Sequence, residues 1–337
     1  MKSKTLVTGG AGFMGSHVAK SLLDMGCDVV VLDDLSGGFR ENVPSGCEFL
    51  KGSILDENVV AKLFKTHKFD VVYHLAAYAA EGLSHFIRRF NYSNNLIGSV
   101  TLLNAAIRAG TKRFVFTSSI AVYGSAQVPM REDMIPIPED PYGIAKRAFE
   151  LDLQVASEMF GIEHVIFRPH NVYGERQNLS DPYRNVVGIF MNRVMQGKAM
   201  PVFGDGTQTR AFTYIADVAS IIAKAGFVKE ATNKIINIGS DQPIAVIDLA
   251  RLVAEAFGRN PEIEFLSPRR EVHHAFSDHT VLRKVFGNIE TTPIEKGIGQ
   301  MAGWARSRGM QKPTFFTDIE IINGLPESWA QFMKDKI

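Results

Sequence analysis

The chain of 337 residues contains only two cysteines, Cys27 and Cys47, too few for a disulfide framework or a cysteine-based zinc site. It also carries little net charge, since 37 lysines and arginines balance 36 aspartates and glutamates to leave +1. Nothing electrostatic therefore favours nucleic acid or an anionic membrane as a partner. No apolar run approaches the ~18 residues that span a bilayer. Strand-like residues Thr5–Thr8 follow Met1 so closely that no signal peptide is expected. A reducing, cytoplasmic location is the prediction.

The sequence alternates between strand-like and helix-like patterns over its first half. The expected strands are nearly continuous in apolar character, as strands covered on both faces are: Thr5–Thr8, Asp28–Leu32, Glu48–Leu50, Asp70–His74, Arg113–Thr117 and His164–Phe167. The expected helices start near Met14, after Asp56, at Asn94 (to Ala109) and at Pro141 (to Phe160). Repeated strand–helix–strand units predict an α/β fold with a Rossmann-type, doubly wound parallel sheet.

The alternation loosens after Gly174. Expected there are an exposed loop (175–182), helices at Val186–Met195 and Ile247–Phe257, and short strands at Met200–Phe203, Phe212–Tyr214 and Ile235–Ile238. We predict a nucleotide-binding domain over residues 1–174, with a segment near 212–240 returning to its sheet. Residues 175–337 would mainly form a smaller α+β substrate-binding region. The tail, residues 312–337, is amphipathic but carries no chemical motif.

A glycine-rich turn, GGAGFMG (9–15), lies between the first expected strand and helix. Gly9, Gly12 and Gly15 permit the tight turn, close approach of backbone to a pyrophosphate, and close strand–helix packing. The spacing is GxxGxxG rather than the usual GxGxxG, and a merely structural turn is the competing interpretation. Asp33 ends the second strand ~20 residues later, where a carboxylate accepts hydrogen bonds from the adenosine ribose hydroxyls. Because it would repel a 2′-phosphate, the predicted cofactor is NAD.

Two further segments predict a hydride-transfer site. Ser119 follows an expected strand, so its hydroxyl should emerge at the carboxyl edge of the sheet, where ligands bind. Tyr142 and Lys146 lie four residues apart on an expected helix and share a face. The lysine would stabilise the tyrosinate, lowering a phenol pKa that is ordinarily ~10. A core tyrosine beside an unrelated lysine is the competing interpretation of such a pair.

Seven segments carry a resemblance to a known family: TGGAGFMG (8–15), VVVLDDLS (29–36), VYHLAA (72–77), SSIAVYG (118–124), YGIAK (142–146), RPHNVYG (168–174) and FGDGTQTRAFTYIADV (203–218). Over about residues 1–300 the chain resembles the extended short-chain dehydrogenase/reductases, in the nucleotide-sugar epimerase/dehydratase branch. The resemblance implies NAD in the large domain and a nucleoside-diphosphate sugar in the small one.

The position before Val122 bears on the reaction. Relatives that dehydrate or decarboxylate carry an acid there, whereas this chain has Ala121, preceded by Ile120. Loss of water needs a further acid/base pair. The resemblance therefore implies 4-epimerisation of a UDP-sugar, with UDP-glucose and UDP-galactose favoured. UDP-glucuronate or UDP-N-acetylglucosamine epimerisation, a dehydratase or reductase reaction, and a non-catalytic dinucleotide sensor stay open as alternatives.

The resemblance also assigns contacts. For the cofactor it implies Phe13 and Met14 at the pyrophosphate, Ser53 and Ile54 at the adenine, and Leu75, Ala76, Ala77 and Asn94 elsewhere along it. Serine at position 53 replaces a usual aspartate. For the sugar nucleotide it implies Ser119, Asn171, Asn185, Arg210, Arg269 and Arg270. The expected helices 94–109 and 141–160 resemble those that pair in a homodimer.

Other positions depart from the family pattern. His170 replaces an aromatic residue and is expected to be structural, and His273, His274 and His279 are expected to be surface or core residues without a carboxylate partner. No metal site is predicted. Ala275 stands roughly where some epimerases place a tyrosine that excludes N-acetylated sugars. Asn178 stands where glucuronate-specific relatives have arginine, and Arg176 lies close to it.

Overall fold

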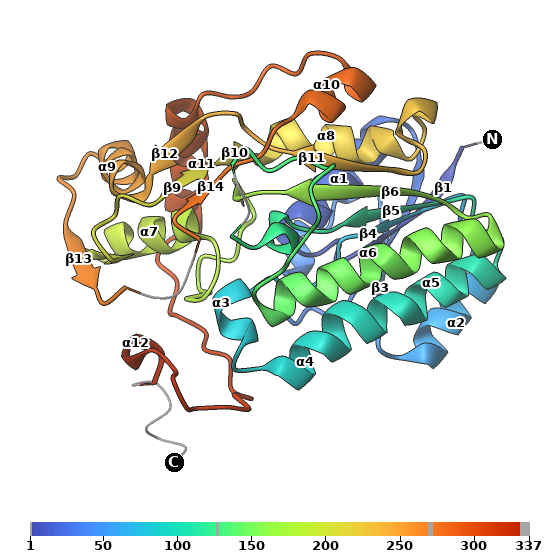
Figure 1. Cartoon of the computed structure of the whole chain (residues 1–337), viewed down its shortest axis with the longest axis horizontal. Coiled ribbons are helices and arrows are strands. Elements are labelled where there is room, and N and C mark those ends of the chain that lie inside the picture. Colours follow the sequence, from blue (N-terminus) through green and yellow to red (C-terminus); the bar gives the residue numbers. More distant parts are fainter. Residues whose placement is uncertain (1, 126–127, 269–271, 331–337) are drawn as a thin grey trace.

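A computed structural model describes residues 2–125, 128–268 and 272–330 of the chain. A seven-stranded sheet forms its centre, with strand order β11-β6-β5-β4-β1-β2-β3 and every neighbouring pair parallel (Figure 1). Its strands are β1 (Lys4–Thr8), β2 (Asp28–Asp33), β3 (Glu48–Lys51), β4 (Val71–His74), β5 (Arg113–Thr117), β6 (Glu163–Pro169) and β11 (Lys234–Ile238). This confirms the predicted Rossmann-type fold.

Helices cover both faces of the sheet, and each face has its own apolar core. On one face α1 (Phe13–Asp24) packs against α8 (Ile215–Ala225), with Val7, Val31 and Ile222 in the core between helices and strands. On the other face lie α2 (Glu57–Thr66), α5 (Gly98–Arg108) and α6 (Pro141–Phe160), as Figure 1 shows, with a core that includes Leu63, Leu102 and Phe149. Both faces are thus buried, which explains the continuous apolar strands.

Local sequence fixes the ends of the helices that matter most. Asp56 accepts hydrogen bonds from the backbone amides of Asn58 and Val59 at the start of α2. Asp140 accepts from the amide of Gly143 at 2.8 Å, and Pro141 occupies the first turn of α6. Gly161 ends α6 in the left-handed region, with φ of 74°. The predicted bounds of α6 are therefore confirmed.

The helix expected from Asn94 to Ala109 is different in the structure. The short helices α3 (Glu81–Ser84) and α4 (Arg88–Tyr92) precede a π-helical turn (Ser93–Ile97), and only then does α5 begin. Asn95 explains the wide turn, because its side chain bonds to the backbone of Tyr78 in both directions, at 2.8 and 3.1 Å. These hydrogen bonds join residues 17 positions apart, so no local sequence pattern predicts the wide turn.

The second half of the chain builds a smaller region beside the carboxyl edge of the sheet. Its helices are α7 (Val186–Met195), α9 (Val246–Ala256), α10 (Thr280–Phe286) and α11 (Ile294–Arg308). Its strands form three small sheets: β12 (Pro243–Ala245) with β9 (Thr209–Ala211) and β14 (His274–Ala275); β13 (Ile263–Leu266) with β8 (Met200–Phe203); and β10 (Thr213–Tyr214) with β7 (Val172–Tyr173). Single 3-10 turns lie at Arg40–Asn42, Ile120–Tyr123 and Lys229–Ala231. The division at residue 174 stays a prediction.

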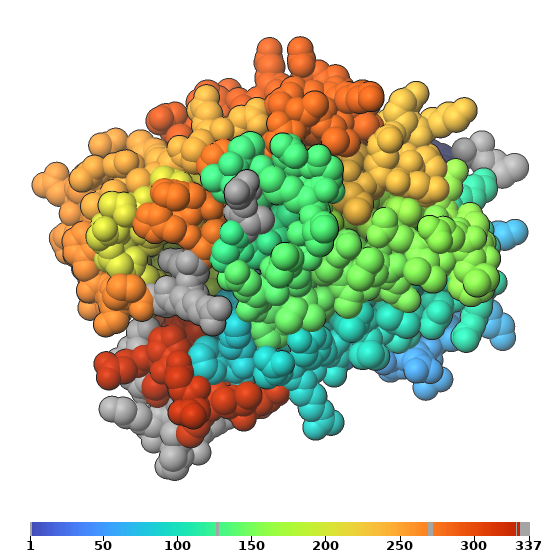
Figure 2. All heavy atoms as spheres, in the orientation of Figure 1, coloured from blue at the N-terminus to red at the C-terminus, as the bar shows by residue number. Residues whose placement is uncertain are grey.

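Residues 313–330, the C-terminal strap, leave α11 and run back across the molecule to α12 (Glu327–Ala330). Figure 2 shows this segment in red against the cyan α3–α4 segment. The Glu320 carboxylate accepts from the amides of Arg89 and Phe90 at 2.7 and 2.8 Å. Trp329 is 7% exposed and packs in an aromatic cluster with Tyr183. The described part of the tail, which had no sequence motif, is therefore docked on the fold.

Candidate active site

One large cleft, of about 940 Å³, lies between the carboxyl edge of the sheet and the smaller region. Eighteen residues predicted for the site line it: Gly9, Gly12, Phe13, Met14, Gly15, Asp33, Ser53, Ile54, Leu75, Ala76, Ala77, Asn94, Ser119, Tyr142, Lys146, Asn171, Asn185 and Arg210. The remaining two, Arg269 and Arg270, lie outside the described residues. The fold thus brings the predicted nucleotide, catalytic and substrate residues to one place.

The glycine turn leaves no room for side chains. Gly9 has a φ of 72°, and a Cβ there would lie 2.7 Å from the amide nitrogen of Ala76. A Cβ on Gly15 would lie 2.1 Å from the carbonyl oxygen of Gly9. No side chain caps helix α1, whose N-cap residue is Gly12. The first amides of α1 are thus presented at the cleft, which is the arrangement that binds a pyrophosphate.

Asp33 is held beside this turn by backbone amides. Its Oδ2 accepts from the amide of Ala11 at 2.9 Å, and its Oδ1 accepts from the amide of Leu35 at 2.8 Å. Burial raises the pKa of the carboxyl, while these hydrogen bonds act in the opposite direction. The carboxylate is therefore oriented at the end of β2, and it fits ribose hydroxyls and disfavours a 2′-phosphate. A dinucleotide of the NAD type fits these residues.

Tyr142, Lys146 and Ser119 come from two elements that meet at the sheet edge. Tyr142 and Lys146 are in the first two turns of α6, and Nζ of Lys146 lies 5.8 Å from the centre of the Tyr142 ring. The same Nζ donates to the carbonyl of Thr117 at 2.8 Å, which ties it to the end of β5. Ser119 follows β5, and its Oγ accepts from the amide of Ala121 at 3.1 Å. The expected proximity of the tyrosine and lysine is present.

Burial disfavours the charged forms of both groups. It lowers the pKa of Lys146 to about 7, against an ordinary value of 10.5. It raises the pKa of the Tyr142 phenol, and a hydrogen bond with Ser119 acts in the opposite direction. The tyrosine pKa is thus not lowered by its protein surroundings alone, contrary to the simple expectation. The reason is that desolvation outweighs the hydrogen bond with Ser119 and the positive charge of Arg184.

A buried ion pair supports α6 one turn beyond Lys146. Glu150 accepts two hydrogen bonds from Arg168, at 2.9 and 2.7 Å, and one from Ser118 at 2.6 Å. Arg168 also donates to the Tyr123 hydroxyl at 2.7 Å. These residues link α6, β6 and the Ser118–Tyr123 segment into one unit. The network fixes the elements that carry Ser119, Tyr142 and Lys146 relative to one another.

Three of the residues expected to hold the sugar nucleotide, Asn171, Asn185 and Arg210, line the wall opposite the catalytic residues. Asn171 and Asn185 have positive φ, 41° and 60°, a conformation that asparagine tolerates better than most residues. Arg210 donates to the carbonyls of Thr209 and His273, each at 2.9 Å. Ala275, at 5% exposure, also lines this wall. The contacts of these residues with a sugar nucleotide stay predictions.

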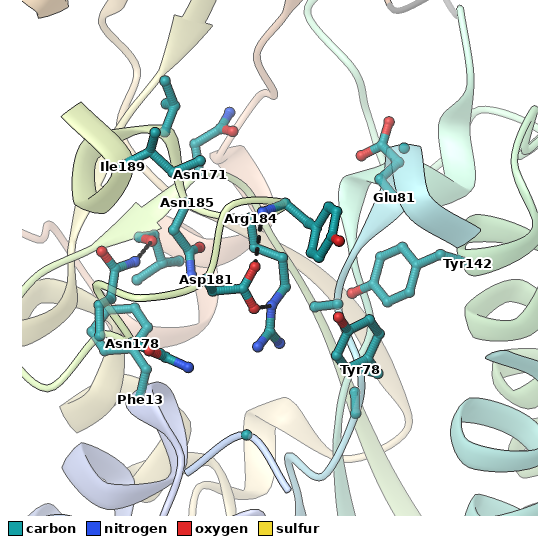
Figure 3. A pocket seen from close by; sticks show the side chains of 18 of the residues that line it. Phe13, Tyr78, Glu81, Tyr142, Asn171, Asn178, Asp181, Arg184, Asn185 and Ile189 are labelled. Carbon is teal, nitrogen blue, oxygen red and sulfur yellow. Dashed lines mark hydrogen bonds and ion pairs between the residues drawn. The ribbon is translucent and has the colours of Figure 1, made fainter. Parts of the chain in front are cut away.

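A cluster that the sequence reading missed lies between the two walls. Nε of Arg184 donates to Asp181 at 2.6 Å, and its guanidinium carbon lies 4.7 Å from the centre of the Tyr78 ring. Figure 3 shows Asp181 and Arg184 in the middle of the pocket, with Tyr78 and Tyr142 on the right of the view and Glu81 above them. The spacing of Asp181 and Arg184 was the available signal. The loop that carries them gave no indication of facing the cofactor turn.

The histidines correct one expectation. His279 has a carboxylate partner, because its Nδ1 lies 2.6 Å from Oδ1 of Asp241. Its Nε2 lies 3.2 Å from Nε2 of His170, and burial lowers the pKa of His170 to about 3. Asp241 is 38 residues from His279 in the sequence, so no local sequence pattern indicates the pairing. His170 is buried at 1% exposure, and its second nitrogen bonds the carbonyl of Ala211 at 3.0 Å.

Within residues 2–125, 128–268 and 272–330, no group of three or more histidine, cysteine, aspartate or glutamate side chains is arranged to hold a metal ion. The described helices include none with the length and apolar character needed to cross a membrane.

Comparison with known proteins gives concordant results. Residues 5–239 match the NAD dependent epimerase/dehydratase family. A UDP-glucose 4-epimerase of Mycolicibacterium smegmatis is 34% identical over 315 residues, covering 90% of this chain and 99% of that protein. The structure of a UDP-glucose 4-epimerase from Thermotoga maritima with UDP-glucose has a TM-score of 0.85 and 35% identity, covering 90% of this chain and 99% of its own. A UDP-glucuronic acid 4-epimerase from Bacillus cereus, in complex with UDP-glucuronic acid and NAD, has a TM-score of 0.84 and 29% identity, covering 90% and 99%. This chain belongs to the NAD dependent epimerase/dehydratase family and is an NAD-dependent nucleotide-sugar enzyme.

Proposed function

We propose that the protein is a UDP-sugar 4-epimerase, with UDP-glucose and UDP-galactose as the favoured pair. One observation carries the proposal: Ser119, Tyr142 and Lys146 share a cleft with the glycine turn, and the neighbouring residues Ile120 and Ala121 are apolar. The first three supply acid–base chemistry at a single sugar carbon. The apolar pair leaves no acid where dehydratases of the family carry one, which favours a reaction without net loss of water.

The cofactor contacts follow from the geometry of the turn. The amides at the start of α1 would hold the pyrophosphate, and Asp33 would hold the adenosine ribose. Ala76 and Ala77, directly after β4, would border the nicotinamide half. When bound, NAD supplies a hydride acceptor that can return the same hydride to the sugar.

The catalytic roles belong to Tyr142, Lys146 and Ser119. Tyr142 would take the proton of the sugar 4-hydroxyl as that carbon is oxidised, and would give it back when the 4-keto sugar is reduced on its other face. Lys146, fixed by Thr117 at 2.8 Å, would stabilise the tyrosinate. Ser119 would donate a hydrogen bond to the same sugar oxygen. Asn171, Asn185 and Arg210 would hold the nucleoside diphosphate from the opposite wall.

An exposed apolar stripe on α6 supports a homodimer. Leu151, Val155 and Met159 recur at spacings of four residues on one side of the helix and are 48%, 60% and 71% exposed. Ile144, one heptad before Leu151, continues the stripe at 40% exposure. Such a stripe on a long helix is typical of a helix–helix interface. Pairing of two copies through α6 would bury it.

The identity of the sugar is tested by turnover. The purified protein is incubated separately with UDP-glucose, UDP-N-acetylglucosamine and UDP-glucuronate, without added NAD and then with it, and proton NMR follows the anomeric signals. Formation of UDP-galactose alone or fastest supports the favoured substrate. Faster reaction of the N-acetylated sugar would follow from the small Ala275 in the wall, and would replace the sugar but keep the reaction. A keto-sugar product, net NADH, or no turnover in any arm would overturn the epimerase proposal.

A further inference from the structure

Arg184 lines the cleft, but none of the predicted cofactor or substrate contacts involves it. Its side chain is only 14% exposed, and that of its partner Asp181 is 7% exposed. The ion pair uses Nε of the guanidinium, at 2.6 Å from Oδ2 of Asp181. On the other side, Nη2 lies 3.6 Å from the place that a Cβ of Gly37 would take. Nη2 of Arg184 therefore lies next to the loop after β2.

That loop rests on the glycine turn. A Cβ on Gly38 would lie 2.5 Å from the carbonyl oxygen of Ala11 and 2.7 Å from the amide nitrogen of Gly12. The amide of Phe39 donates to the same Ala11 carbonyl at 3.0 Å. The loop beside Arg184 thus packs against the backbone of Ala11 and Gly12, where a pyrophosphate would bind. Figure 3 shows Arg184 extending from the loop above into the middle of the pocket.

The segment that carries Arg184 is fastened to both halves of the molecule. At its start, Arg176 donates to the carbonyl of Ser16 at 3.2 Å and its own carbonyl accepts from Asn42 at 3.3 Å. In its middle, the carbonyl of Ser180 accepts from the amide of Thr314, in the C-terminal strap, at 2.8 Å. Arg184 is therefore held over the cofactor groove by the surrounding structure, and does not depend on a mobile loop tip.

The charge balance of the groove indicates what Arg184 would bind. A pyrophosphate is anionic, and the glycine turn offers it only amide groups and a helix terminus. Besides Arg184, four lysines and arginines line the described cleft. Lys146 lies beside the tyrosine ring, Arg193 lies 3.5 Å from Glu264, and Arg210 bonds the backbone near residue 273. Lys198 is exposed beyond the end of α7. Among these cations, Arg184 lies next to Gly37, in the loop that packs on the glycine turn.

We infer that Arg184 is a cofactor clamp: it crosses the groove from the substrate side, binds the NAD pyrophosphate through its outer guanidinium nitrogens, and slows the release of the dinucleotide. Asp181 positions the guanidinium and is not itself in contact with the phosphates. This inference rests on NAD dependence and is independent of which sugar is turned over. It gives a physical basis for keeping the reduced cofactor in place until its hydride is returned.

The test measures NAD retention in the purified holoenzyme. Arg184→Met removes the cation, and the double variant Asp181→Asn, Arg184→Gln removes it without leaving a buried carboxylate unpaired. The protein is first loaded with labelled NAD, and an excess of unlabelled NAD is then added. The label that stays with the protein is measured over time after gel filtration. Both variants should release NAD about ten- to a hundredfold faster than the unchanged protein, as loss of a charge-assisted contact to a phosphate implies. The rate of NAD release from Arg184→Lys should lie between that of the unchanged protein and that of Arg184→Met.

The matched control is Arg251→Met. Arg251 also donates to an aspartate three residues earlier, Asp248, at 2.6 Å, but it lies on α9 and outside the described lining of the cleft. Its NAD release should be unchanged. Unchanged release in both Arg184 variants would overturn the inference, as would a variant that alters only the KM for the sugar nucleotide. Because release is measured without sugar, the result stands apart from the epimerase proposal.

Discussion

The guanidinium of Arg168 donates to both carboxylate oxygens of Glu150, at 2.9 and 2.7 Å, and neither side chain is more than 1% exposed. Glu150 is one turn from Lys146 on α6. Arg168, on β6, also donates to the Tyr123 hydroxyl at 2.7 Å. The pair therefore joins helix α6, which carries Tyr142 and Lys146, to strand β6 of the sheet.

Removal of one partner should be costly. Glu150→Leu leaves Arg168 buried without its counter-charge, and the free energy of unfolding should fall by about 3–5 kcal/mol. Urea unfolding followed by circular dichroism measures the change. The exposed pair of Arg131 and Asp133 supplies the control, since Asp133→Asn should leave the midpoint unchanged. Equal effects of the two substitutions would contradict a structural role for the buried pair.

The phenol of Tyr142 should be needed for turnover and not for cofactor binding. Tyr142→Phe keeps the ring but removes the acid–base group, so we expect kcat to fall by about 10²- to 10⁴-fold. NAD content, measured after denaturation and release, should stay as in the unchanged protein. Tyr92→Phe, on α4 and outside the described lining of the cleft, should keep full activity. Activity that survives in Tyr142→Phe would remove the tyrosine from its assigned role.

One methyl group should be enough to close the cofactor turn. Gly15→Ala places a Cβ 2.1 Å from the carbonyl oxygen of Gly9, so the turn must open and NAD should no longer co-purify. Gly299→Ala is the control, because that glycine is within α11 and its Cβ would meet no atom within 4 Å. There the substitution should stabilise by about 0.4–1 kcal/mol. Retention of NAD by Gly15→Ala at the normal level would show that the turn does not bind it.

Acid should destabilise the fold through His164. Burial lowers the pKa of this histidine to about 4, and neither ring nitrogen has a hydrogen-bond partner among the described atoms. The unfolded histidine has a pKa of ~6.5. Between these values the unfolded chain binds a proton that the native protein does not, so stability is lost as the pH falls through this window. His164→Leu should show a smaller decrease in Tm between pH 7 and pH 5, and parallel curves would count against this account.

The fold was largely predictable, because its signals are local. Buried parallel strands read as short apolar runs, Asp56 caps α2 and Pro141 occupies the first turn of α6 as expected, and Gly9 and Gly15 mark a turn without room for side chains. Tyr142 and Lys146 were also visible, since a spacing of four residues places both on one side of a helix.

The remainder of the site depends on contacts between distant parts of the chain. His279 pairs with Asp241, 38 residues away, and Asn42 bonds the carbonyl of Arg176 across 134 residues. The shift of the Tyr142 pKa is likewise a consequence of burial, which no spacing reveals. The position of Arg184 over the cofactor turn combines several such contacts. Sequence patterns identify the groups, whereas tertiary packing decides what they face.

The C-terminal strap has a consequence for how the protein is made. Pro313, Phe315 and Trp329 line the cleft, yet they are translated after every other described residue that surrounds it, the latest of which is Ala275. The strands of the central sheet are synthesised before the strap, and folding during synthesis generally proceeds from the N-terminal side. The cleft of a nascent chain therefore lacks one wall until the strap emerges from the exit tunnel. Completion of this wall therefore follows the synthesis of every other described residue that lines the cleft.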